Sequence, residues 1–230
     1  MQNAYNAGST IGSYLAALGF NVDFAPVADV LTNPDNQVIG QRSFGSDAQT
    51  VAGMVTSELQ GLSAAGVYGM VKHFPGHGGT SGDSHDGAVS TDKTLEELMA
   101  EELVPFQSAI DGGVNFVMVG HISAPNVTGD NAPATLSKVL ITDVLRGQMG
   151  YNGIVITDAM NMEAITGFYN SDKAAVLAVT AGADMILMPA DYNTAYTGIL
   201  NAVNDGTITE ERINESVTRI VKAKLAMGQP

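Results

Sequence analysis

The sequence predicts an α/β fold in which strands of a parallel sheet alternate with helices. Strand-like apolar runs and amphipathic stretches alternate along the 230 residues, and each connection is long enough for a right-handed crossover. The strand-like runs are apolar throughout, as in parallel strands covered on both faces. Polar residues follow the C-terminal ends of successive strands, which is where α/β enzymes hold their active sites.

An open doubly wound sheet and a (β/α)₈ barrel both fit this alternation. The polar residues at several strand ends favour a TIM-like (β/α)₈ barrel, because the loops of a barrel converge on one site. An open sheet instead gathers ligands mainly at its switch point. About five strands are recognisable, whereas such a barrel typically has eight strands and about 250 residues.

The elements of the first half follow from periodicity and from helix-end signals. Helical periodicity over 5–18 stops at Gly19, and a strand over 21–30 runs into a loop. A second helix, 47–65, ends at Gly66, which suits the position after a helix because glycine adopts the left-handed conformation. The apolar run 67–71 is then expected to be a buried strand.

The second half repeats the pattern. Thr94 and Glu97 form a capping-box pattern that opens a helix over 94–110. The other expected elements are strands at 114–119, 153–157 and 183–188 and helices at 137–149, 171–181, 193–203 and 210–227.

Composition excludes several classes of partner. Apolar residues make up 45% and charged residues 15%, which is typical of a globular protein. The net charge of −14 argues against nucleic acid or an anionic membrane as the main partner, and no apolar run approaches the length of a spanning helix. The absence of cysteine excludes disulfides and thiolate metal sites. Composition fits a cytoplasmic or an extracellular location equally.

The densest group of ionisable residues follows the expected strand 67–71. Lys-His-Phe-Pro-Gly-His-Gly at 72–78 and Asp-Ser-His at 83–85 bring together three of the four histidines. The interspersed glycines allow the backbone to bend closely around a ligand. This stretch, called the histidine loop below, is a candidate active site, and a solvated loop with incidental histidines is the alternative.

Three residues are candidates for catalysis. Asp158 stands at the tip of strand 153–157, where a carboxylate could act as a nucleophile toward an oxocarbenium-like centre; a turn or helix-cap role is the alternative. Asp83 and His85 can meet in a turn, and the aspartate would raise the pKa of the imidazole so that it serves as a general acid. The alternative for this pair is a solvated polar loop.

Four further residues are candidates for ligand binding. Lys72 and His73 offer donors and an acceptor suited to sugar hydroxyls, or form a buried structural pair. Arg42 could hold a ligand or fix its own loop, and Met160 could line a pocket or pack in the core.

A metal site is a second interpretation of the histidine-rich pattern. His73, His77, Asp83, His85 and His121 are all of ligating types. Against a metal, His73 and His77 lie in a Pro/Gly loop and not on a helix face, where their spacing would align them.

Together the motifs resemble the β-N-acetylglucosaminidases of glycoside hydrolase family 3. The histidine loop, 72–85, is similar to the signature of that family. Phe-Ala-Pro-Val-Ala-Asp-Val at 24–30, Arg-Ser-Phe-Gly at 42–45 and Ile-Thr-Asp-Ala-Met-Asn-Met at 156–162 resemble it in order and spacing. The likeness covers nearly the whole chain and implies one catalytic domain over 1–230 with a TIM-like barrel.

The resemblance implies a retaining glycosidase that removes terminal β-linked N-acetylglucosamine. Asp158 would form the glycosyl-enzyme, and His85, assisted by Asp83, would protonate the leaving oxygen and then activate the acceptor. A neutral imidazole does not repel phosphate, which leaves phosphorolysis open beside hydrolysis.

The resemblance also implies how the sugar is bound. Lys72, His73 and Arg42 match positions that bind N-acetylglucosamine in subsite −1, and no metal or other cofactor is needed. The expected partner is a saccharide containing N-acetylglucosamine, and the expected process is peptidoglycan or chitin turnover.

The resemblance departs from the family at the front of the chain. Family members begin with two further βα units, whereas this chain starts inside the helix that would follow the second. We therefore expect an N-terminally truncated barrel, with self-association through exposed strand edges.

Two other interpretations of the function are a metal-dependent hydrolase that uses the cluster of His73, His77 and His85, and an inactive sugar-binding fragment.

Overall fold

The computed structural model describes residues 1–84 and 87–227. Its described residues form two compact units. Unit 1 consists of residues 1–81 and 93–118, and unit 2 consists of residues 82–92 together with the chain from 119 onward. The division falls inside the strand β4 (Phe116–Val119).

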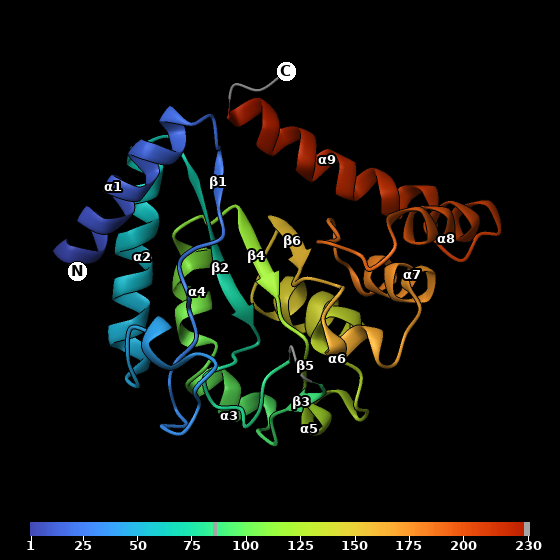
Figure 1. Cartoon of the computed structure of the whole chain (residues 1–230), viewed down its shortest axis with the longest axis horizontal. Coiled ribbons are helices and arrows are strands. Elements are labelled where there is room, and N and C mark those ends of the chain that lie inside the picture. Colours follow the sequence, from blue (N-terminus) through green and yellow to red (C-terminus); the bar gives the residue numbers. More distant parts are fainter. Residues whose placement is uncertain (85–86, 228–230) are drawn as a thin grey trace. The chain divides into compact units, whose positions relative to one another are not determined.

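Unit 1 is built on neighbouring strands with helices packed beside them (Figure 1). The strands lie in the order β1 (Val22–Asp23), β2 (Tyr68–Phe74) and β4. β1 and β2 pair in parallel, with Val22 opposite Tyr68. The helices are α1 (Gln2–Ala17), α2 (Ala48–Ala64), α3 (Leu95–Ala100) and α4 (Val104–Asp111), and η1 (Gly40–Arg42) is a short 3₁₀ turn.

Glycines allow α1 and α2 to pack at short distance along their length. A Cβ atom on Gly8 would stand 2.3 Å from the carbonyl oxygen of Glu58, and one on Gly61 would stand 2.2 Å from that of Tyr5. Real side chains do not tolerate such distances, so any larger residue at Gly8 or Gly61 must push the helices apart. In Figure 1 these two helices run side by side.

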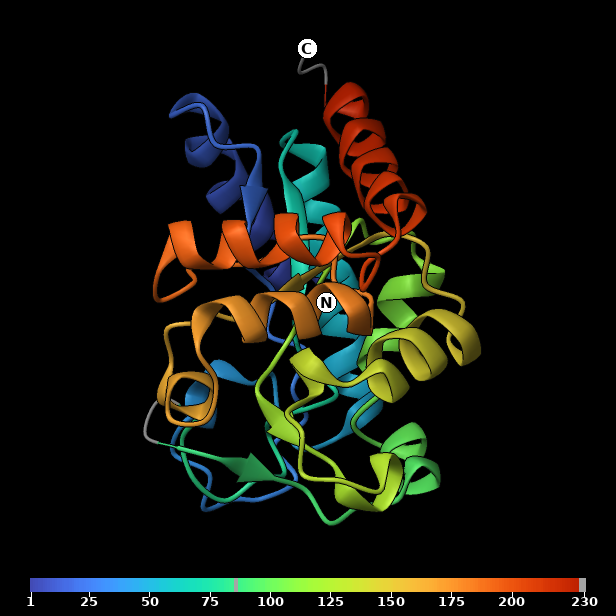
Figure 2. The same ribbon diagram turned by 90° about the vertical axis from the view of Figure 1, so that its right-hand side faces the viewer.

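Unit 2 contains β6 (Ile154–Thr157) and a two-stranded parallel sheet of β3 (Val89–Ser90) and β5 (Ile122–Ser123). Its helices α7 (Ser171–Ala181) and α8 (Tyr192–Asn204) run side by side in Figure 2. Val179, Ala202 and Ile208 form a buried cluster there. The other helical segments are α5 (Pro125–Thr128), η2 (Ala134–Leu136), η3 (Val139–Gln148), α6 (Glu163–Thr166) and α9 (Glu210–Ala226).

A buried carboxylate connects several elements of unit 2. The side chain of Asp184 is fully buried and accepts hydrogen bonds from Arg146 at 2.6 Å, Arg219 at 3.0 Å and Ser216 at 2.6 Å, and from the Val155 N–H at 3.0 Å. Burial acts to raise the pKa of Asp184, but Arg146 and these hydrogen bonds outweigh it and hold the pKa below its ordinary value. Asp184 thus ties α9 and η3 to β6.

The α/β class with parallel strands, expected from the sequence, is confirmed. The expected capping box is present in α3, where Thr94 accepts from the Glu97 N–H and the Glu97 side chain accepts from Thr94. Asp47 caps α2, and Gly66 has φ +81. These features depend on neighbours in sequence, which is why the sequence reveals them.

Other expectations need correction. The helix expected over 94–110 is two helices, because the backbone leaves helical geometry at Glu101 (φ −136, ψ −76). The strand expected over 183–188 is reduced to a single parallel bridge between Ile156 and Met185. The helix expected over 137–149 is a π-helix, η3. β3 and β5 were not expected, since each has only two residues.

None of the helices in the described part of the chain is both long enough and apolar enough to cross a membrane.

Candidate active site

In unit 1, two histidines of the histidine loop share one buried carboxylate. Asp29 is fully buried, and its Oδ2 lies 2.8 Å from Nδ1 of His73. Its Oδ1 accepts hydrogen bonds from the backbone N–H of His77 at 2.7 Å and of His73 at 3.2 Å. Because an ionised carboxylate only accepts, Nδ1 of His73 carries a hydrogen. Asp29 therefore fixes both the tautomer and the orientation of the His73 ring.

The second histidine is held by a threonine in the same loop. The Thr80 hydroxyl lies 2.8 Å from Nδ1 of His77 and 2.8 Å from the His77 carbonyl oxygen. A hydroxyl has one proton to donate and the carbonyl can only accept, so Nδ1–H of His77 donates to the Thr80 oxygen. The Asn36 side chain donates to the His77 carbonyl at 2.8 Å. Both rings are therefore fixed by specific partners.

Glycine is required where the histidine loop passes close to other segments of the same unit. A Cβ on Gly78 would stand 2.0 Å from the Val30 carbonyl oxygen, and one on Gly76, which has φ +119, would stand 2.7 Å from Cβ of Glu102. These contacts explain the glycine-rich composition of the loop in physical terms. They also place the loop directly over Glu102.

Glu102 lies almost fully buried against the histidine loop. Its Oε1 accepts hydrogen bonds from the Thr32 hydroxyl at 3.0 Å and from the ammonium of Lys93. Lys93 also pairs with Glu101 at 2.7 Å. Burial acts to lower the pKa of Lys93, but the two glutamates outweigh it and raise the pKa above its ordinary value. The sequence interpretation did not identify this support of the loop.

The other binding candidates of unit 1 lie at the ends of its strands and in the following loop. Lys72 is half-buried on β2, where its carbonyl accepts from the Ala28 N–H at 2.7 Å. Burial raises the pKa of Asp23, and Lys72 acts in the opposite direction. Arg42 is exposed, and its guanidinium donates to the Val38 carbonyl at 3.3 Å.

In unit 2, Asp158 directly follows β6 and is half-buried. Its Oδ1 accepts a hydrogen bond from the Ala159 N–H at 2.8 Å, and its own N–H donates to the Val119 carbonyl at 2.8 Å. Met160 is 3% exposed, and its N–H donates to the Leu187 carbonyl at 2.9 Å. The carboxylate is thus held at the C-terminal end of a parallel strand, where the sequence analysis expected it.

The expected acid/base pair is described only in part. Asp83 is half-buried in unit 2, and His85 lies outside the described residues. The next residue after Asp83, Ser84, is buried, and its carbonyl accepts from the Ala164 N–H at 3.3 Å. This bond joins the chain next to Asp83 to α6.

A pocket of about 480 Å³ opens in unit 2 beside the same segment. It is lined by Ala88, which directly precedes β3, by His121 and Ser123, and by Phe168 and Tyr169 after α6. Its lining combines aromatic and polar side chains, as ligand pockets commonly do.

The metal interpretation finds no support in the part of the chain that the structure describes. Among residues 1–84 and 87–227, no three histidine, aspartate or glutamate side chains are grouped so that they could hold a metal ion. His73 and His77 instead bind Asp29 and Thr80. His85, the third member of the proposed cluster, lies outside this description.

Comparison with known proteins identifies the family of the chain. Residues 1–223 match the family described as glycosyl hydrolase family 3 N terminal domain. The chain belongs to this family.

Two curated relatives are bacterial β-hexosaminidases. The chain is 34% identical to beta-hexosaminidase A of Pseudoalteromonas piscicida, with 98% of this chain and 41% of the relative covered. It is 38% identical to beta-hexosaminidase LpqI of Mycobacterium tuberculosis, with 93% of this chain and 56% of the relative covered. The chain therefore spans about half the length of these relatives.

A solved structure is similar over nearly the whole chain. It is a glycoside hydrolase family 3 beta-N-acetylglucosaminidase from Paenibacillus sp. str. FPU-7, 45% identical, with a TM-score of 0.96. The match covers 98% of this chain and 43% of that one. The family resemblance read from the motifs is thereby confirmed, and the fold is that of the TIM-barrel-like domain of this family.

Proposed function

We propose that this protein is a retaining β-N-acetylhexosaminidase that removes terminal β-linked N-acetylglucosamine, with residues 1–230 belonging to one catalytic domain. The observation that carries the proposal is the half-buried carboxylate of Asp158 at the end of β6, oriented by the Ala159 N–H at 2.8 Å. The names of the relatives support the substrate, since they are β-hexosaminidases and a β-N-acetylglucosaminidase.

In this mechanism Asp158 is the nucleophile. Its carboxylate oxygen attacks the anomeric carbon while the bond to the leaving oxygen breaks, which gives a covalent glycosyl-enzyme. The second step hydrolyses this ester with net retention of configuration. The N–H of Ala159 donates a hydrogen bond to Oδ1 of this nucleophile at 2.8 Å and so orients the carboxylate.

His85 and Asp83 serve as the acid/base pair. The imidazole of His85 protonates the leaving oxygen in the first step and accepts a proton from the incoming acceptor in the second. Asp83 stabilises the imidazolium and fixes its tautomer. A neutral imidazole does not repel the negative charge of phosphate, so phosphate can serve as an acceptor and phosphorolysis is part of this proposal.

Lys72, His73 and Arg42 bind the sugar in subsite −1, and Met160 contributes to the wall of the sugar pocket. The fixed tautomer of His73 supports its role. Because Nδ1–H is committed to Asp29, the other ring nitrogen, Nε2, is an acceptor that suits a sugar hydroxyl. A long flexible lysine and an exposed arginine supply further donors.

Substitution of the nucleophile tests the proposal. We expect p-nitrophenyl N-acetyl-β-glucosaminide to be cleaved, and we expect Asp158→Ala to lose at least about 10³-fold in kcat, since no covalent intermediate can form. Azide should partly restore turnover by Asp158→Ala, with a glycosyl azide of inverted configuration as product. As a matched control, Asp143→Ala removes an exposed carboxylate of the same unit and should keep wild-type kcat. Full activity of Asp158→Ala would refute the proposal.

A further inference from the structure

His121 stands just past β4 with its imidazole 1% exposed. Its Nε2 lies 3.0 Å from the Ala159 carbonyl oxygen, and its Nδ1 lies 2.8 Å from the hydroxyl of Thr135, which is itself fully buried. A carbonyl oxygen only accepts, so Nε2 carries the hydrogen; Nδ1 of the neutral ring then accepts from the Thr135 hydroxyl. The two partners therefore assign the tautomer of His121.

The main chain on either side of Ala159 is held by two other segments of unit 2, at Val119 and at Leu187. The N–H of Asp158 donates to the Val119 carbonyl at 2.8 Å, and the N–H of Met160 donates to the Leu187 carbonyl at 2.9 Å. Between these two anchors, the carbonyl of Ala159 is fixed by the His121 side chain. The side chain thus completes the anchoring of a turn that bears the nucleophile.

We infer that His121 is a positioning residue for Asp158, an inference that rests on the proposed nucleophilic role of Asp158. By fixing Ala159, His121 keeps the Ala159 N–H aimed at Oδ1 of Asp158, 2.8 Å away. That hydrogen bond sets the direction of the attacking carboxylate. A displacement of about 1 Å at a reacting group is enough to cost about 10²-fold in rate.

The competing explanation is that His121 only stabilises the core. Two substitutions separate these roles. His121→Phe keeps a buried ring but loses the donor to Ala159, whereas His121→Gln keeps an amide N–H near the position of Nε2. Tyr151→Phe is the matched control, because its buried hydroxyl donates to the Ile154 carbonyl at 2.9 Å, at the other end of β6 from Asp158.

Steady-state kinetics with p-nitrophenyl N-acetyl-β-glucosaminide provide the test. We expect His121→Phe to lower kcat about 10²-fold with KM changed less than about threefold, because substrate binding is retained while the nucleophile is misaligned. His121→Gln should stay within about tenfold of wild type. Tyr151→Phe should lose thermal stability without losing kcat. Wild-type kcat in His121→Phe, or an equal loss in Tyr151→Phe, would overturn the inference and leave the proposed function intact.

A second measurement does not depend on turnover. The ¹³C carboxyl resonance of Asp158 and the amide resonance of Ala159 should shift in His121→Phe, stay near wild type in His121→Gln and remain unchanged in Tyr151→Phe. If the wild-type protein cleaves no substrate, the proposed function fails, and these resonances still decide whether His121 positions the Asp158 carboxylate. Unshifted Asp158 and Ala159 resonances in His121→Phe would overturn it.

Discussion

Two histidines, His73 and His121, differ in which ring nitrogen donates its hydrogen. His73 gives Nδ1–H to the Asp29 carboxylate, whereas His121 gives Nε2–H to a backbone carbonyl. The first arrangement commits Nδ1 of His73 to a carboxylate, and the second engages both nitrogens of His121 within the protein. These different partners agree with the different roles that we propose, sugar binding for His73 and positioning of Asp158 for His121.

Sequence reasoning identified these residues but not their partners. Asp29 belongs to the motif at 24–30 that carried the family resemblance, yet its contact with His73 spans 44 positions along the chain. Nothing in the sequence indicated that Glu102 is buried, because a glutamate in a helical stretch is usually solvated. Its burial depends on Gly76 and Gly79, which pass over it in the folded protein. Spacing reveals local pairs, whereas contacts of this kind are set by tertiary structure.

We expect that replacing a buried glutamate of α2 by a neutral residue increases the stability of the fold in a pH-dependent way. Burial raises the pKa of Glu58, and the nearby charge of Asp23 raises it further. A raised folded-state pKa in an acid means that folding is opposed once pH exceeds the ordinary value near 4.5. We expect Glu58→Gln to increase the free energy of unfolding at pH 7, with the gain disappearing as pH falls below that value.

Urea unfolding at several pH values measures this effect. Glu96→Gln, at an exposed position, serves as the matched control and should show little change. A Glu58→Gln protein less stable than wild type at pH 7 would show that the carboxylate has a stabilising partner and that the explanation is wrong.

At the scale of elements, the helix ends were predictable because their signals are local. Asp47, Thr94 with Glu97, and Gly66 act on backbone groups within a few residues. The break between α3 and α4, the π-helical hydrogen bonds of η3 and the short pairing of β3 with β5 were not predictable in this way. Each depends on how distant segments pack.

The Asp184 network predicts a large loss of stability when its carboxylate is removed. Asp184→Ala would leave Arg146 and Arg219, both mostly buried, without their shared anion. Removing one member of a buried ion pair costs about 3–5 kcal/mol. We expect a loss of this size in urea unfolding, measured near neutral pH.

The control for this substitution is an exposed ion pair of the same unit. Asp143 pairs with Lys138 at 2.9 Å with both side chains about half exposed or more, so Asp143→Ala should cost less than about 1 kcal/mol. Because the pKa of Asp184 is lowered in the folded protein, its stabilisation is complete above the ordinary value near 3.8 and declines as pH falls below it. Equal effects of the two substitutions would contradict the proposed role of the network.

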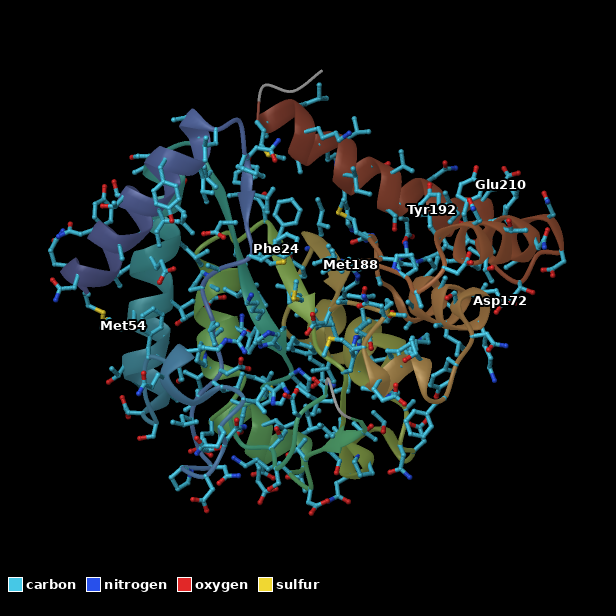
Figure 3. All side chains as sticks on the ribbon, in the orientation of Figure 1. Phe24, Met54, Asp172, Met188, Tyr192 and Glu210 are labelled. Atoms are coloured by element: carbon cyan, nitrogen blue, oxygen red, sulfur yellow. The ribbon has the colours of Figure 1, made fainter. Side chains whose placement is uncertain are left out.

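At the scale of the whole molecule, exposed apolar side chains predict self-association. On α8, Tyr192, Tyr196 and Leu200 follow one helical face and are 69%, 58% and 47% exposed, and the two tyrosine rings stack with centroids 6.2 Å apart. Tyr192 is labelled in Figure 3. Contiguous apolar surface of this kind favours association between protein molecules.

Light scattering coupled to size-exclusion chromatography measures this property. We expect the average mass of the isolated chain to rise with concentration, and we expect Tyr196→Lys with Leu200→Lys to reduce the rise. The control is Thr180→Lys, which places one lysine on an exposed position of α7. A constant monomeric mass at all concentrations would contradict the prediction.

Fold and function differ in how far the sequence determined them. The α/β class followed from alternating apolar patterns, and the motifs in 24–30, 72–85 and 156–162 identified the family that comparison then confirmed. The strand at 183–188 was overestimated, because apolar composition does not reveal whether a segment pairs along its length. The catalytic roles stay predictions, since composition and pattern do not report reactivity.

The central claim is that Asp158 forms a covalent bond to the sugar. A 5-fluoro-N-acetylglucosaminyl fluoride would be attacked by the carboxylate with loss of fluoride, and the trapped ester would hydrolyse slowly. Mass spectrometry of the intact and digested protein measures the outcome. We predict one added sugar per chain, located on the peptide that contains Asp158; a label on another residue, or continued turnover with no label, would contradict the account.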